Sequence, residues 1–247
     1  MAAAIWLADK LFYKRDGETV VTQDTYSADG ISSVSVSLGV GYVELVEKKD
    51  SDVFSVSAVG AEDGFYTVST DGGVLSVTSD ELRWYDRELY KTSDSYGITI
   101  SIPASFDGDI AVTTDAGDVT VTALTATELD IYSDVGDISL SDVTVPVIDV
   151  YADVGNISLE SIASDSVAVE ADVGNVAFSE ATSGSSLTFL KLASDVGNVD
   201  ASLVGSRDDY AISARSDSGH CNVISGGDGI PVELSTDVGN VNVKFGK

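Results

Sequence analysis

Apolar and polar residues alternate along much of the chain, and a period of two residues is typical of β-strands. In one unit, Leu129 and Ile131 flank Asp130, and the alternation resumes at Ile138 and Leu140. A glycine lies between these two halves. Each unit therefore predicts two short strands that are joined by a tight turn.

These units repeat around an Asp-x-Gly-Asp/Asn motif, with glycines at positions 117, 136, 155, 174, 197, 219 and 239 and intervals of 19, 19, 19, 23, 22 and 20 residues. A nearly fixed period indicates a repeat architecture. Successive hairpins would not require identical turns, whereas stacked parallel coils place each residue about 4.8 Å above its counterpart. We therefore predict an all-β fold, a parallel β-solenoid with about 19–23 residues per coil.

Stacking assigns a direction to each column of residues. The glycine is expected where no side chain fits between coils, and the Asp or Asn after it at a corner, where side-chain amides can bond to one another along the stack. The Asp two residues before the glycine is expected to point outward. The inward positions of three successive coils are expected to be Leu129, Ile131, Val135, Ile138, Leu140, Ile148, Val150, Val154, Ile157, Leu159, Val167, Val169, Val173, Val176 and Phe178.

The repeats predict one continuous domain over residues 31–247. Within it, residues 31–104 predict irregular first coils with an insertion at 80–95, and residues 105–247 predict the regular coils. Residues 1–30 are expected to be an N-terminal cap or the remnant of a membrane-anchor region.

The first residues fit either a short amphipathic helix over the first coil or the trimmed end of a membrane anchor. The apolar face of this helix would carry Ile5, Ala8, Leu11 and Phe12. No stretch reaches the roughly 20 apolar residues that a membrane helix needs.

The charge of the chain limits its partners. It has 13 Lys and Arg against 41 Asp and Glu, a formal net charge of −28. Such a surface repels nucleic acid and anionic lipid head groups, so neither is an expected partner. The single cysteine, Cys221, cannot form an internal disulfide bond.

The repeated DxG[DN][IV] motif, the strand Gly97–Pro103 and the segment Gly72–Val77 resemble the bacterial putative-adhesin family, a DUF4097-type β-helix domain. The resemblance covers roughly residues 31–243. It implies a single-stranded right-handed β-helix that is often tethered to the cell envelope by an N-terminal membrane segment. It implies no established biochemical activity, because function resides in sites rather than in folds.

The repeated aspartates are the first candidate site. Each is expected to form an Asx-turn, in which the carboxylate accepts a hydrogen bond from the N–H of its own glycine. A calcium ion that bridges two coils through Asp134, Asp153 and Asp172 is the alternative, although the sequence lacks the nonapeptide of calcium-loaded β-rolls. We otherwise expect no cofactor.

Catalysis is not expected. The single histidine, His220, takes the corner position that Asp or Asn holds in other coils, and Cys221 takes an inward position. No nucleophile elbow, phosphate loop or zinc spacing is present. A polysaccharide-active β-helix enzyme remains an alternative, but the repeated carboxylates recur in neighbouring coils, whereas a reaction centre needs one coil to differ.

Aromatic residues are the second candidate site. Tyr132 and Tyr151 occupy the same outward column, and with Trp84 and Tyr85 they could form a platform for sugar or peptide. Stacked aromatics also support parallel coils, so the platform and the structural ladder both remain open. The sequence thus predicts a non-catalytic cell-envelope interaction or scaffold protein, with an unknown envelope protein or glycan as partner. A calcium-stabilised structural solenoid is a further alternative.

Overall fold

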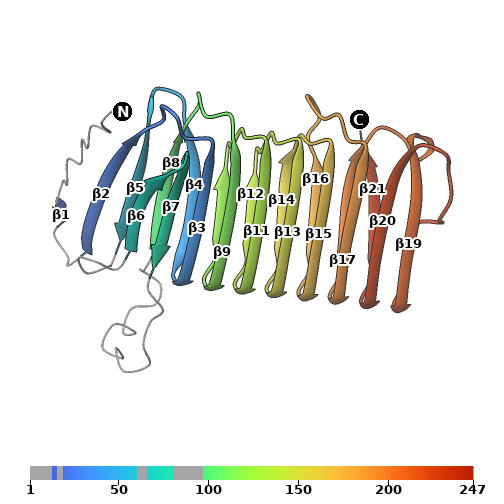
Figure 1. The fold of residues 1–247 in the computed structure, drawn as a ribbon. Coiled ribbons are helices and arrows are strands. Elements are labelled where there is room, and N and C mark those ends of the chain that lie inside the picture. The colour runs from blue at the N-terminus through green and yellow to red at the C-terminus, as the bar shows by residue number, and fades with distance from the viewer. Residues whose placement is uncertain (1–12, 16–18, 60–65, 80–96, 247) are drawn as a thin grey trace.

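The computed structural model describes residues 13–15, 19–59, 66–79 and 97–246 (Figure 1). The predicted N-terminal helix and the predicted insertion at 80–95 lie outside these residues. In the part of the chain that is described, no helix is long and apolar enough to span a membrane.

The described residues form two long sheets whose strands are mostly parallel, which confirms the all-β prediction (Figure 1). The first sheet contains, in spatial order, β1 (Tyr13–Arg15), β2 (Thr19–Ser27), β5 (Val53–Val59), β8 (Gly97–Pro103), β4 (Tyr42–Lys48), β10 (Val119–Thr122), β12 (Ile138–Ser141), β14 (Ile157–Ile162), β16 (Val176–Glu180), β18 (Val199–Val204) and β21 (Val241–Gly246). The second sheet contains β19 (Tyr210–Ser218), β20 (Ile230–Val238), β17 (Phe189–Val196), β15 (Ser166–Val173), β13 (Val147–Val154), β11 (Glu128–Val135), β9 (Asp109–Ala116), β3 (Ser33–Val40), β7 (Val74–Ser79) and β6 (Tyr66–Asp71).

Six of the seven motifs join a strand of the second sheet to a strand of the first through a glycine corner, and we call each such strand pair a rung. The seventh, at Gly219, joins β19 to an isolated bridge between Cys221 and Val241. The corners lie along the lower edge in Figure 1. Ser133 pairs with Ala152 and Val135 with Val154 on parallel strands, and the next rung continues both columns. The prediction that Asp134, Asp153 and Asp172 lie above one another is therefore confirmed.

The spatial order of the last rungs differs from their order in the sequence. Strand β20 pairs with both β17 and β19, so the final rung inserts between two earlier ones. Gly239 contacts Gly197 on one side, and Gly219 contacts Gly239 on the other. The coils at this end therefore do not stack in chain order, and the segment between β19 and β20 folds over the outer edge of β19.

That segment caps the end of both sheets. Ile212 in β19 exchanges two backbone hydrogen bonds with Gly226, at 2.8 and 2.7 Å. In the first sheet, Asn222 acts in place of a further strand: its Oδ1 accepts from the Val243 N–H at 2.8 Å, and its Nδ2 donates to the Val243 carbonyl at 3.2 Å. The backbone groups at these positions thus have partners within the chain.

The N-terminal strands are paired differently from the later rungs. Strands β3 and β4 form a rung that pairs with β9 and β10. On the opposite side, β7 and β8 pair with the same rung in parallel. However, β6 and β5 pair antiparallel with β7 and β8, so this region contains antiparallel pairs in addition to coils.

The interior of the rungs is mainly aliphatic, as predicted, with Leu129, Ile131, Ile138 and Leu140 at 0–3% exposure. The prediction of an inward column at Val135, Val154 and Val173 is wrong. These three side chains are 53%, 47% and 47% exposed. The last inward position before the corner is held instead by Ser133 and Ala152, which are fully buried, and the chain bends at the glycine that follows the valine.

Contact between the corner glycines is very close. A Cβ atom on Gly155 would lie 1.9 Å from the Gly136 carbonyl oxygen, and one on Gly174 would lie 1.8 Å from that of Gly155. The predicted absence of space for a side chain is confirmed. The predicted Asx-turn is wrong: the Gly136 N–H donates to the carbonyl of Val154 in the next rung at 3.0 Å.

This contact makes one substitution costly. Gly155→Ala would force its methyl group into the backbone of the preceding rung, and we expect the free energy of unfolding to fall by about 1–3 kcal/mol or more. Denaturant unfolding followed by circular dichroism would measure the loss. Gly246→Ala is the matched control, because nothing lies within 4 Å of its added Cβ. Equal stability of both variants would contradict this account of the corner.

A second substitution should stabilise the protein. The hydroxyl of Ser133 is buried without a hydrogen-bond partner, while Ala152 and Ala171 hold the same position in the next rungs. Ser133→Ala should raise the free energy of unfolding by about 1 kcal/mol, because an unsatisfied buried group is removed. Ser194→Ala should lower it, since that hydroxyl donates to the Gly174 carbonyl at 2.8 Å. A loss of stability in Ser133→Ala would refute the conclusion that the Ser133 hydroxyl lacks a hydrogen-bond partner.

Candidate functional site

The candidate site lies on the outer face of the second sheet, at strands β11 and β13. Tyr132 and Tyr151 are direct neighbours in the parallel register of these strands. Their rings stack with centroids 5.2 Å apart and planes 10° from parallel. We call this pair the tyrosine ledge. Tyr132 is 40% exposed, so the ledge is open to a partner in solution.

The hydroxyl groups of the ledge are fixed by the aspartate column of the next rungs. The Tyr132 hydroxyl donates to Asp153 Oδ1 at 3.3 Å, and the Tyr151 hydroxyl donates to Asp172 Oδ1 at 2.8 Å. Desolvation and the nearby carboxylates Asp134 and Asp153 raise the pKa of Tyr132 to about 12. The hydrogen bond to Asp172, together with desolvation, raises the pKa of Tyr151 as well. Both hydroxyls therefore remain protonated donors at neutral pH.

An open hollow of about 300 Å³ lies beside the ledge. Small residues make room for it: Ala111 and Ala168 flank the Asp130 and Asp149 pair in register. The hollow therefore combines aromatic edges, methyl groups and carboxylates. This mixture can contact the apolar and hydroxyl faces of a ligand at once.

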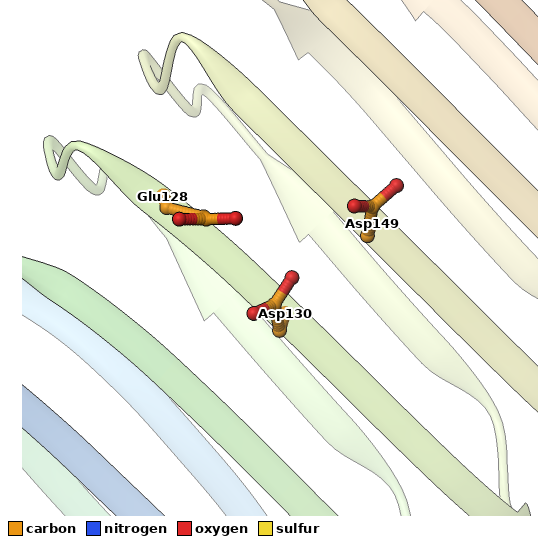
Figure 2. Close-up of side chains that lie close together, drawn as sticks. All are labelled: Glu128, Asp130 and Asp149. Carbon is orange, nitrogen blue, oxygen red and sulfur yellow. The ribbon is translucent and has the colours of Figure 1, made fainter.

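Three carboxylates gather at the other side of the hollow. Figure 2 shows Glu128 and Asp130 on one strand and Asp149 on its neighbour. One oxygen atom from each lies within 4.8 Å of the others, and all three residues are exposed. Oxygen donors at this spacing are suited to a hard divalent cation such as calcium.

Repulsion and desolvation act on this group. Desolvation, then the charges of Asp149 and Asp109, raise the pKa of Asp130 above its ordinary value of 3.8. Because the folded state then binds this proton more tightly than the unfolded chain, the ionised carboxylate lowers stability at neutral pH. That penalty disappears as the pH falls through the raised pKa.

Asp130→Asn should therefore raise the free energy of unfolding at pH 7, by less than about 1 kcal/mol because the site is exposed. The difference from the parent should shrink as the pH falls towards the ordinary carboxyl range near 4. Urea titrations at several pH values would measure it. Asp71→Asn, at an exposed position far along the sheet, is the control. A variant that is less stable at pH 7 would contradict the repulsion.

The structure brings together some of the sequence candidates. Tyr132 and Tyr151 meet as expected, whereas Trp84 and Tyr85 lie outside the described residues. The metal candidates Asp134, Asp153 and Asp172 form an aligned column. In the described part of the chain, the group with metal-ligand spacing is instead Glu128, Asp130 and Asp149. Sequence reasoning missed it, although the recurrence of Asp130 and Asp149 between apolar residues was a usable signal.

The corner column also behaves as expected. Asn156, Asn175, Asn198 and Asn240 each donate through Nδ2 to the side-chain oxygen of the preceding rung, at 2.9–3.2 Å. The backbone N–H of His220 donates to Asn240 Oδ1 at 3.1 Å, so His220 continues this ladder. Cys221 is partly buried against the core, beside Val241.

The stacked rungs and their repeated surface columns define a repeat β-protein with an exposed aromatic and acidic face. The model of the Toastrack DUF4097 family matches residues 33–247, which is most of the chain. The protein therefore belongs to this family, as its motifs had indicated. No curated protein matches the chain.

The chain is similar to several solved structures at low sequence identity. A putative adhesin from Bacteroides fragilis is 17% identical with a TM-score of 0.50, over 91% of this chain and 97% of that one. A putative cell adhesion protein from Clostridium sporogenes is 12% identical with a TM-score of 0.47, over 93% and 100% of the two chains. A putative lipid binding protein from Parabacteroides distasonis is 12% identical, with a TM-score of 0.33 over 93% and 98%. Of these three, the Bacteroides fragilis structure has a TM-score of 0.50, and at 17% identity that likeness concerns the fold alone.

Proposed function

We propose that this protein is a non-catalytic interaction or scaffold protein of the bacterial cell envelope, and that its ligand binds at the tyrosine ledge. The exposed stack of Tyr132 and Tyr151 beside an open hollow is the observation that carries the proposal. We also infer that the rungs form a right-handed single-stranded β-helix with 19–23 residues per coil. An N-terminal membrane segment would tether it to the envelope.

The chemistry of the ledge favours a ligand with both apolar faces and hydroxyl or amide groups. Aromatic rings contribute a large contact area, and the neighbouring carboxylates accept hydrogen bonds from the ligand. A glycan or a peptide of an envelope protein has these groups. The adhesin name given to the Bacteroides fragilis protein is consistent with this class of partner. Nucleic acid is disfavoured by the net charge of −28.

A calcium-stabilised structural solenoid is the second candidate, because Glu128, Asp130 and Asp149 have carboxylate oxygens at metal-ligand spacing. In that case the ion would offset the repulsion between rungs, and the ledge would serve as a structural ladder. The two candidates differ in what they require of Tyr132 and Tyr151. Binding requires the rings to be accessible, whereas the ladder requires them only to stack.

Glycan and peptide arrays would test the proposal with the purified protein. The double variant Tyr132→Ser/Tyr151→Ser should lose about 10-fold or more in apparent affinity for the ligands that the parent binds, since aromatic anchors dominate such contacts. Ile224→Ser, an exposed apolar residue on the C-terminal cap, should bind like the parent.

Unchanged binding in the double variant would refute the ledge as the site. Release of products from a polysaccharide would support the enzyme alternative instead. A melting temperature that falls on addition of a chelator, without any ligand binding, would favour the calcium-stabilised solenoid.

A further inference from the structure

The valines that precede the corner glycines form a continuous apolar surface along the corner edge of the stack. Val135, Val154, Val173, Val196 and Val238 are direct neighbours in the register of β11, β13, β15, β17 and β20. We call this column the valine ridge. Each member is about half-exposed, and the ridge holds five of the eight large exposed apolar side chains among the described residues. Exposed apolar surface of this protein is thus concentrated in one line, which is typical of interaction sites.

Stacking alone does not account for the choice of valine. A β-branched side chain supports the strands on either side, but threonine has the same shape and does not leave two methyl groups in water. The outward positions of β10 and β12, at Thr120 and Ser139, carry hydroxyl side chains. On the ridge, valine recurs in five successive rungs.

A column of carboxylates runs alongside the ridge, because each valine directly follows an aspartate. This aspartate column consists of Asp134, Asp153, Asp172, Asp195 and Asp237. The ion pairs within the described residues are Lys191 with Glu170 and Arg215 with Asp217. Asp217 lies on β19, next to Asp237 at the end of the column, and neither pair involves the five aspartates named above. The surface is therefore an apolar line beside a line of carboxylates without cationic partners among those residues.

The spacing of the rungs distinguishes between possible occupants. Neighbouring valines are about 4.8 Å apart along the stack. Residues on one face of an α-helix recur every 4.5–6 Å along its axis, at intervals of three or four residues and about 1.5 Å per residue. Alternate residues of an extended peptide are about 6.6–6.8 Å apart and lose register after one or two rungs. A helix advances about 5.4 Å per turn, so over the four steps of the ridge, about 19 Å or roughly 13 helical residues, it departs from the valine spacing by about 2.4 Å in total, less than an extended peptide does after two rungs.

Charge then determines the chemistry of that helix. Basic side chains beside its apolar face would lie over the aspartate column, and carboxylates would be repelled. The same column repels anionic lipid head groups, which disfavours a membrane surface as the occupant.

We propose that the valine ridge and the aspartate column together form a docking surface for a cationic amphipathic helix of a partner protein. The valines of this site lie apart from the tyrosine ledge, whereas Asp153 and Asp172 also accept hydrogen bonds from the ledge hydroxyls. The proposal rests on the proposed function only in that the chain acts as an interaction protein. The apolar face of the helix packs on the valines, and its Lys or Arg residues pair with the aspartates.

A synthetic peptide of about 14 residues, held helical by a side-chain lactam, provides the probe. It carries leucine at helical spacing on one face and lysine beside it. We expect it to bind the full chain in fluorescence anisotropy. Val135→Thr/Val154→Thr/Val173→Thr, which keeps the side-chain shape, should weaken binding at least 10-fold with an unchanged melting temperature. Asp134→Asn/Asp153→Asn/Asp172→Asn should reduce the dependence of binding on salt.

Three controls separate docking from charge attraction. A scrambled peptide of the same composition and a peptide with glutamate in place of lysine should both bind at least 10-fold more weakly. Tyr132→Ser/Tyr151→Ser should bind the helical peptide like the parent, so failure of the ledge and failure of the ridge are distinguishable. Equal binding of the scrambled peptide, no loss in the threonine variant, or no binding of the helical peptide would each overturn the proposal.

Discussion

The close contact between successive corner glycines is the constraint on which the rest of this structure depends. With no side chain at the corner, the backbone of one rung lies directly against that of the next, and the Gly N–H donates to a carbonyl of the neighbouring rung. This contact fixes the register. Once the register is fixed, every side chain lies beside its counterparts, and each column must be stable as a stack rather than residue by residue.

Stacking brings like charges close together, and the corner column and the aspartate column differ in how many charges they keep. Two carboxylates about 4.8 Å apart repel each other by roughly 0.9 kcal/mol at the dielectric of water. In the corner column, Asp118 and Asp137 give way to asparagines in later rungs, whose amides donate to the preceding rung and carry no charge. The aspartate column stays charged, with Asp153 and Asp172 accepting hydrogen bonds from the tyrosines. Repulsion between neighbouring aspartates is thus retained beside the tyrosine ledge and the valine ridge, although asparagine would have removed it.

The same logic explains how far the sequence predicts the structure. Identical motifs at a nearly constant interval require stacking, so the strands, the glycine contact, the amide ladder and the tyrosine ledge could all be derived from it. Alternation cannot assign a direction at a corner, where the chain bends, and therefore Val135 was placed inside. The insertion of β20 beside β17 was not predictable, because nearly equivalent rungs fit either position. Glu128 gives no repeat signal, because Val147 and Ser166 hold the same position in the next rungs.

The altered order of the last rungs has a consequence for how this protein can bind partners. A parallel stack normally ends in an open strand edge that can pair with another chain. Here the segment between β19 and β20 occupies that edge, with Gly226 paired to Ile212 and Asn222 bonded to Val243. Addition of a strand from a partner at these positions would have to displace internal hydrogen bonds. A partner would therefore bind more readily to the side-chain columns on the faces of the stack than to this strand edge. On those faces the repeats place identical groups at a fixed spacing.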